Sequence, residues 1–329
     1  RNYWQHSAAT SNAFNTNLYN PIVDASEQMP TSYPTIVPYA DNRYVSYTLT
    51  DQMSMLDDKL QVILGARYQD IDTKNLYKKT KYSSDKLSPS LGLVVKPFSE
   101  DLSFYASYVE GLSEGVTVSD MTYPTATNKG ETLAPYQTKQ YELGTKYQVG
   151  SWLNTLALYQ IEKPEAYQDS TSLEVKDDAE TRSRGIEFST AGQLTEDLSL
   201  MANLAYIDAE YVKSGTASQV GNTVIGTPDF TAGLGLDYKI PVVDGMSVNA
   251  RASYVSEQYL NTDNSLELPD YTILDLGAKY ATKIGGVNTT FRANVNNLTD
   301  EKYWSGVFGS NYAILGAGRT YKLGVTFDF

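Results

Sequence analysis

The last eleven residues, Arg319-Thr-Tyr-Lys-Leu-Gly-Val-Thr-Phe-Asp-Phe329, decide the fold class. Every second residue from Tyr321 to Phe329 is apolar or aromatic, and the residues between them are polar or small. A period of two places alternate side chains on opposite faces of an extended chain. The stretch therefore predicts a β-strand with one apolar face and one polar face.

The same alternation recurs along most of the chain, whereas helical spacing is scarce. Apolar and aromatic residues alternate with Gly, Asn, Thr or charged residues, and turn-forming residues separate the segments. We predict thirteen strands, at 42–53, 58–75, 86–97, 101–112, 136–148, 151–164, 181–193, 197–213, 228–240, 245–261, 270–283, 286–298 and 317–329.

Two architectures fit this pattern, a soluble β-sandwich and a membrane β-barrel. Tyrosine is abundant, with 27 Tyr against 9 Phe and 3 Trp. Many apolar faces end in tyrosine, as at Tyr68, Tyr108, Tyr206 and Tyr238, while the opposite faces are polar. Aromatic girdles around an apolar outer band, with a polar interior, are typical of antiparallel transmembrane β-barrels, so we favour the barrel.

The connections between the predicted strands alternate between short and long, which orients the barrel. Outer-membrane barrels place short turns in the periplasm and long loops outside the cell. The last strand then descends to the periplasm, and so does the first. We therefore expect residues 1–41 to form an extracellular loop segment and residues 42–329 to form the C-terminal portion of the barrel. An odd strand number that begins outside the cell predicts part of a larger barrel, because an open sheet leaves unpaired edges in lipid.

Composition excludes several other classes of protein. The chain has 26 Lys and Arg against 39 Asp and Glu, a net charge of −13, which disfavours nucleic-acid binding. It contains no cysteine and one histidine, so thiolate sites and multi-histidine metal sites are excluded. His6, Ser7 and Asp24 could be arranged as a hydrolase triad, but their spacing is not diagnostic. We expect no enzyme and no cofactor.

Several stretches of the sequence resemble the TonB-dependent siderophore receptors. The most specific is Asn296-Asn297-Leu298-Thr299-Asp300, followed by Tyr303-Trp304, Gly318-Arg319-Thr320 and a terminal Phe. The further stretches are 56–60 leading into 64–68, 107–112, and 161–164 before 182–187. The resemblance implies a 22-stranded barrel of which this chain holds the last thirteen strands, with the N-terminal plug domain and the TonB-engaging segment absent.

The resemblance also implies a function and partners. The receptor would bind a ferric siderophore, which carries the iron as cargo, and TonB-ExbB-ExbD would drive its transport across an outer membrane of lipid and lipopolysaccharide. Aromatic side chains on the loops or upper strand ends would contact the chelate. The candidates are Tyr3, Trp4, Tyr123, Tyr136, Tyr167, Trp304 and Tyr312. Each of them has an alternative role in girdle or loop packing.

The predicted loop 165–180 carries six acidic residues against Lys176, a net charge of −5. A negative mouth repels a highly anionic catecholate complex, which favours a nearly neutral hydroxamate siderophore. Alternatively, this loop is simply solvated, with divalent cations bridging it to lipopolysaccharide. The rival function for the whole chain is that of a passive diffusion porin, whose length would suit a 16-stranded barrel.

Overall fold

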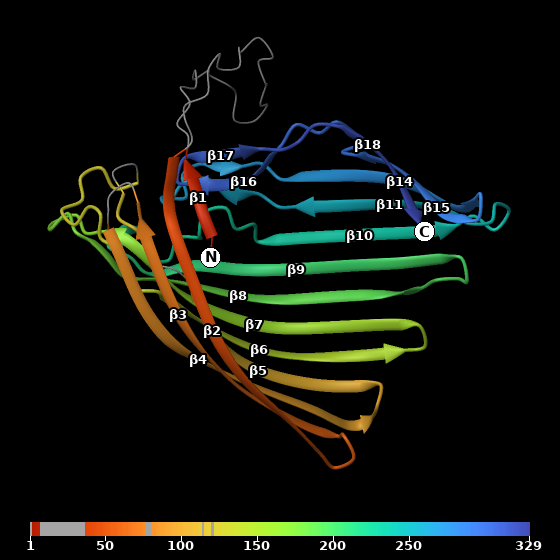
Figure 1. The fold of residues 1–329 in the computed structure, drawn as a ribbon, viewed down its shortest axis with the longest axis horizontal. Coiled ribbons are helices and arrows are strands. Elements are labelled where there is room, and N and C mark those ends of the chain that lie inside the picture. The colour runs from red at the N-terminus through yellow and green to blue at the C-terminus, as the bar shows by residue number, and fades with distance from the viewer. Residues whose placement is uncertain (1, 7–36, 77–79, 114, 120–121) are drawn as a thin grey trace, which may run out of the picture.

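A computed structural model describes residues 2–6, 37–76, 80–113, 115–119 and 122–329. One large antiparallel sheet of fourteen strands contains most of them, and two small hairpins lie at one end of it. Figure 1 shows the long strands running side by side across the molecule. The only helix in the described part is the 3₁₀ turn η1 (Ala217–Gln219), so no described helix is long enough to cross a membrane.

The strands of the large sheet follow the chain order without a crossover. They are β1 (Asn2–His6), β2 (Val37–Met55), β3 (Leu60–Asn75), β4 (Thr80–Ser99), β5 (Leu102–Ser113), β6 (Tyr136–Val149), β7 (Trp152–Gln168), β8 (Val175–Gln193), β9 (Leu198–Lys213), β10 (Phe230–Lys239), β11 (Met246–Val255), β14 (Tyr271–Ile284), β15 (Val287–Asn296) and β18 (Thr320–Asp328). The hairpins are β12 (Gln258–Tyr259) with β13 (Glu267–Leu268), and β16 (Trp304–Gly309) with β17 (Tyr312–Leu315).

The predicted alternation is confirmed by the strand register. Leu143 of β6 pairs with Leu158, which pairs with Ile186, which pairs with Tyr206, so one face carries a continuous apolar row. The residues of the opposite face carry polar and small side chains, such as Glu187 beside Ala157 and Ala205. Leu143, Leu158, Ile186 and Tyr206 are all exposed. We call these the apolar face and the polar face.

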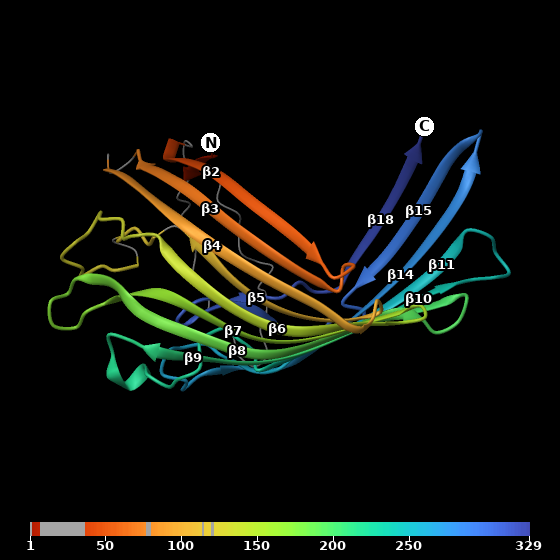
Figure 2. The same ribbon diagram turned by 90° about the horizontal axis from the view of Figure 1, so that it is seen from below.

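The sheet curves into a trough and is open (Figures 1 and 2). Within the described residues, β18 pairs only with β15, and β2 pairs with β1 only from Val37 to Asn42. The thirteen long strands are those predicted, and β1 is an additional short strand. The short turns lie at one end of the trough, as at Gly285 and Gly286, whose φ angles of 59° and 88° suit a tight hairpin.

The structure corrects some strand boundaries and loops. The segment 165–180 is mostly strand and not a loop, because Glu165 pairs with Ala179 and Gln168 with Val175. The predicted loops 262–269 and 299–316 contain β13 and the β16–β17 hairpin. Within 1–41, Asn2–His6 is strand, and β2 begins at Val37 instead of 42. The apolar alternation does not indicate these extensions, because the paired backbone continues beyond the apolar band, where side chains no longer alternate.

Candidate functional site

The long connections between the described strands lie at the end of the trough opposite the short turns, and we call this end the mouth (Figure 1). The segments that contribute to it are the connection 114–135 (of which 115–119 and 122–135 are described), the β7–β8 tip (169–174), the connections 214–229 and 256–270, and the β16–β17 hairpin. Side-chain hydrogen bonds and single backbone hydrogen bonds, and not regular strand pairing, join these segments to each other. The connections of the mouth are therefore held in defined positions relative to each other.

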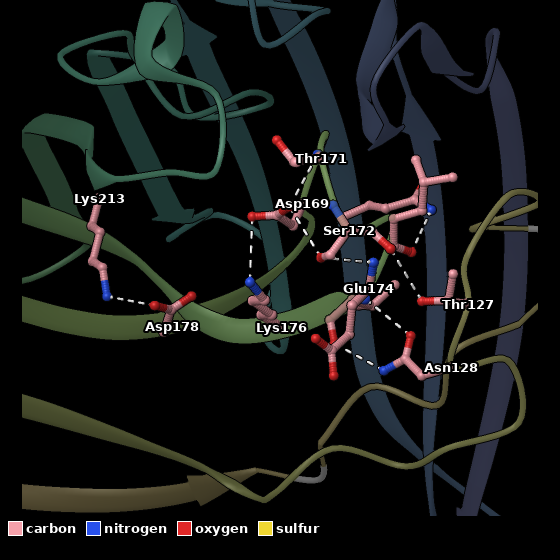
Figure 3. A network of polar contacts seen from close by, with 12 residues as sticks. Thr127, Asn128, Asp169, Thr171, Ser172, Glu174, Lys176, Asp178 and Lys213 are labelled. Carbon is pink, nitrogen blue, oxygen red and sulfur yellow. Dashed lines mark hydrogen bonds and ion pairs between the residues drawn. The ribbon is translucent and has the colours of Figure 1, made fainter.

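Asn128 fastens the connection 114–135 to the β7–β8 tip (Figure 3). Its Nδ2 donates to the carbonyl oxygen of Val175 at 3.0 Å, and its Oδ1 accepts from the Val175 N–H at 3.0 Å. The N–H of Thr127 donates to the carbonyl oxygen of Leu173 at 3.0 Å. The amide group of Asn128 thus reproduces the two bonds of a strand pair, which holds the connection without a further strand.

The β7–β8 tip is organised by Asp169. Its carboxylate accepts bonds from the N–H of Ser172 (2.7 Å), the hydroxyl of Ser172 (3.0 Å) and the N–H of Thr171 (3.0 Å). These donors, led by the Ser172 N–H, lower the pKa of Asp169 to about 2. The Lys176 ammonium group lies 3.3 Å from the same carboxylate.

Two lysines outside segment 165–180 offset part of its acidic charge. Lys163 pairs with Glu165 at 2.6 Å, and Lys213 pairs with Asp178 at 2.9 Å. The hydrogen bond from Lys213 is the main reason that the pKa of Asp178 is lowered. Three carboxylates of segment 165–180, those of Glu174, Asp177 and Glu180, have no ion pair with any described residue. Segment 165–180 therefore remains negative.

Tyrosines and apolar side chains pack beneath the connection 114–135. Val118, Ala126, Leu133 and Val175 form a buried cluster, against which Tyr123 packs. Tyr136 is 7% exposed, and burial, followed by the proximity of Tyr123, Glu165 and Asp177, raises its pKa to about 12. Such tyrosines serve as structural supports of the mouth, because their rings are covered by the chain's own side chains.

Asparagine side chains also join the connections 214–229 and 256–270. The Asn222 Nδ2 donates to the carbonyl oxygen of Thr262 at 2.8 Å. Asn264 Oδ1 accepts from the Thr223 N–H at 2.7 Å, and its Nδ2 donates to the Thr223 carbonyl oxygen at 3.0 Å. The N–H of Gly226 donates to the carbonyl oxygen of Tyr259 at 2.9 Å. The two connections thus form one unit.

A clasp centred on Asn297 closes the base of the β16–β17 hairpin. Asn297 is 3% exposed, and its Nδ2 donates to the carbonyl oxygens of Glu301 (2.9 Å) and Ala317 (3.1 Å). Its Oδ1 accepts from the Glu301 N–H at 2.8 Å. The carboxylate of Asp300 accepts from the Arg319 N–H at 2.9 Å. These bonds hold the two ends of the connection 297–319 close to each other.

The β16–β17 hairpin above this clasp has a buried side and an exposed side. Trp304, 9% exposed, packs on Leu260 and Leu268. The exposed side carries Phe308 and Tyr312, which are 84% and 69% exposed. No charged residue occurs between Lys302 and Arg319 in a chain of net charge −13. This exposed aromatic surface is suited to contact a bulky, weakly charged ligand.

Comparison with known proteins identifies the family. Residues 2–298 match the family described as "TonB dependent receptor-like, beta-barrel". The chain belongs to this family. The ferrichrome receptor FcuA of Yersinia enterocolitica is 31% identical over 95% of this chain and 42% of its own length. The ferrioxamine B receptor of Salmonella typhimurium is 28% identical over 94% of this chain and 44% of its own length.

Solved structures of TonB-dependent receptors have the same fold. BauA, the ferric preacinetobactin receptor from Acinetobacter baumannii, is 33% identical with a TM-score of 0.76. The match covers 94% of this chain and 47% of that one, so the chain spans less than half the length of the relatives it matches. The predicted family, antiparallel outer-membrane barrel fold and outer-membrane localisation are confirmed. The relatives are receptors and transporters, not enzymes.

The aromatic residues predicted to contact the ligand lie in different surroundings. Tyr123, Tyr136 and Trp304 are covered by the mouth's own packing, whereas Tyr312 is exposed. Tyr167 lies on β7, where a hydrogen bond with Asp178 raises its pKa. Tyr3 and Trp4 lie on β1, and their side chains are outside the described residues, as are Ser7 and Asp24. Among the five candidates whose side chains the structure describes, Tyr123 and Trp304 pack on two separate buried clusters, and ligand contact by any of the seven stays a prediction.

The sequence pattern did not indicate Phe308, Asn128 or Asn297 as residues that build the mouth. The uncharged run between Lys302 and Arg319 could have indicated Phe308, because such a run is unusual in so acidic a chain. No local signal indicated Asn128, since its partner Val175 is 47 residues away. The quoted stretch that begins at Asn296 contains Asn297, but its role as a clasp requires the positions of Glu301 and Ala317.

Proposed function

We propose that this chain forms part of the barrel of an outer-membrane receptor that takes up a ferric siderophore. Membership of the receptor family and the names of the relatives support this proposal. The observation that carries it for this chain is the exposed, uncharged aromatic side of the β16–β17 hairpin at the mouth. Ligand capture there needs no covalent chemistry, and the iron travels as cargo within the chelate.

We further propose that transport depends on TonB-ExbB-ExbD and that the ligand is a hydroxamate siderophore. Ferrichrome and ferrioxamine, which the receptors of Yersinia and Salmonella are named for, are hydroxamates. The three carboxylates without ion pairs in segment 165–180 support this choice, because they repel a strongly anionic chelate. The structural relative BauA is named as the receptor of ferric preacinetobactin, which is therefore the appropriate competing ligand to test.

Uptake of radioactive iron tests the function and its energy source. A strain lacking the receptor gene should fail to accumulate iron from a ferric hydroxamate under iron limitation, and the gene should restore uptake only where TonB is active. Restoration without TonB would contradict the proposed energy dependence. Swelling of receptor-containing liposomes by free sugars, with no siderophore uptake, would instead support a porin.

The hairpin surface can be tested with a matched pair of variants in the receptor. Phe308→Ser should weaken binding of the ferric siderophore about tenfold, since a buried aromatic contact contributes on the order of 1–2 kcal/mol. Phe98→Ser is the control, because Phe98 is 81% exposed near the short turn between β4 and β5, at the opposite end. Equal binding by both variants and the unchanged receptor would exclude the hairpin as a contact surface.

A further inference from the structure

The buried side of the β16–β17 hairpin rests on other connections of the mouth. Among the described residues the two strands pair only with each other, and a single hairpin is marginally stable by itself. Val307 and Ala313, which pair in register, pack against the buried cluster of Leu260, Leu268 and Trp304. The hairpin therefore takes its position from the surfaces that these two residues contact.

Gly226, in the connection 214–229, provides one of these surfaces. A Cβ built on Gly226 would lie 2.9 Å from the Val307 Cβ and 3.5 Å from its Cγ2. Carbon atoms in contact are about 3.5–4.0 Å apart, so a methyl group on Gly226 would require a displacement of about 1 Å. The missing side chain at Gly226 thus sets how closely the hairpin approaches this connection.

The backbone around Gly226 is held on both sides, so the hairpin is the part that would move. The N–H of Gly226 donates to the carbonyl oxygen of Tyr259 at 2.9 Å, and the N–H of Val224 donates to that of Ala209 on β9 at 2.9 Å. The asparagine side chains described above join the same connection to segment 256–270. A residue larger than glycine at position 226 would therefore push Val307 outward.

A displacement of Val307 is carried directly to the exposed aromatic side of the hairpin. Phe308 follows Val307 in β16, and adjacent residues of a strand point to opposite faces. At the tip of the hairpin, the N–H of Asn311 donates to the carbonyl oxygen of Leu260 at 2.9 Å. The same displacement would lengthen this bond, so the contact at Gly226 determines both the place and the anchoring of the aromatic side.

We propose that Gly226 is a positioning residue for ligand capture, because it sets the place of the aromatic side of the hairpin without touching the ligand. The inference rests on the proposed function, since it concerns the same surface. It makes the affinity for the siderophore depend on a connection that lies behind the hairpin, through packing alone and without any charge or polar side chain.

The test uses the complete receptor in outer membranes, ferrichrome as the probe and two glycines of the same connection. Gly226 and Gly221 have φ angles of 69° and 88°, and both donate their N–H to a carbonyl oxygen. A Cβ on Gly221 meets no atom within 4 Å, so both alanine variants share the backbone strain and only Gly226→Ala displaces the hairpin. Gly226→Ala should bind ferrichrome at least about threefold more weakly than Gly221→Ala, because the contact surface is displaced.

Three further measurements separate positioning from a general loss of stability. The ferrichrome concentration that gives half-maximal uptake should rise in Gly226→Ala, while the maximal rate should match that of Gly221→Ala. The amide hydrogen of Asn311 should exchange faster in Gly226→Ala than in Gly221→Ala. Val307→Gly removes the opposing Cβ, so the double variant should bind ferrichrome more tightly than Gly226→Ala does alone.

Several outcomes would overturn the inference. Equal weakening by Gly226→Ala and Gly221→Ala would assign the effect to backbone strain. A fall in the maximal rate alone, or no recovery with Val307→Gly, would assign it to a loss of folded receptor. If Phe308→Ser weakens ferrichrome binding and Gly226→Ala does not, this inference fails and the proposed function stands. If Phe308→Ser has no effect, the proposed contact surface and this inference fail together.

Discussion

At the scale of single residues, Asn297 illustrates how one amide can determine the position of a connection. Replacement by Ala removes the bonds to the Glu301 N–H and to the carbonyl oxygens of Glu301 and Ala317. We expect a loss of about 2–3 kcal/mol of stability, from net contributions of about 1 kcal/mol per bond. Protease cleavage within the β16–β17 hairpin should rise, measured against Asn296→Ala. Equal cleavage of both variants would mean that the clasp is dispensable.

Asp169 provides a pH-dependent contact at the same scale. Its folded pKa of about 2 lies below the ordinary value of about 3.9, so its stabilising contribution is complete above about pH 4 and is lost as the pH falls through about 2. An NMR titration of the carboxyl carbon should give a midpoint near 2. Ser172→Ala removes one donor and should raise that midpoint. A midpoint near 3.9 in the unchanged protein would refute the assigned bonds.

At the scale of elements, aromatic rings on the polar face lie over glycines of the next strand. A Cβ built on Gly144 of β6 would be 2.5 Å from the Tyr105 ring of β5, whereas one on Gly111 meets no atom within 4 Å. Gly144→Ala should therefore lower the free energy of unfolding, measured with urea, by about 1–3 kcal/mol, because the added Cβ displaces the Tyr105 ring. Gly111→Ala should be close to neutral. The double variant Gly144→Ala with Tyr105→Ala should lose less stability than the sum of the losses of the two single variants.

The strands were predictable from sequence, whereas the arrangement of the mouth was not. Each strand has one side that faces lipid and one that faces water, so each strand by itself requires alternation. This alternation is present from Tyr321 to Phe329 and in the twelve earlier segments. The supports of the mouth link distant residues, as Asn128 links to Val175 and Asn222 to Thr262. The stretch that gave the most specific resemblance to the receptors contains Asn297, which the structure shows to be a clasp. The resemblance gave no means of distinguishing buried Trp304 from exposed Tyr312.

At the scale of the whole molecule, the open edges of the sheet limit what this chain can form by itself. Residues 43–55 of β2 pair with β3 alone, and β18 pairs with β15 alone, among the described residues. Each unpaired N–H or C=O group on those edges costs several kcal/mol in the hydrocarbon of a bilayer. We therefore expect this chain, expressed alone and refolded in detergent, to fail to form a sealed, monodisperse barrel.

Two measurements on the same sample check this expectation. The chain alone should migrate identically on a gel with and without heating, because heat-dependent migration requires a closed barrel that resists detergent. Amide hydrogens of β18 should exchange much faster than those of β7 and β8, which are paired on both sides. Slow exchange at both edges would mean that β2 and β18 find partners, and the open trough would then be the wrong description.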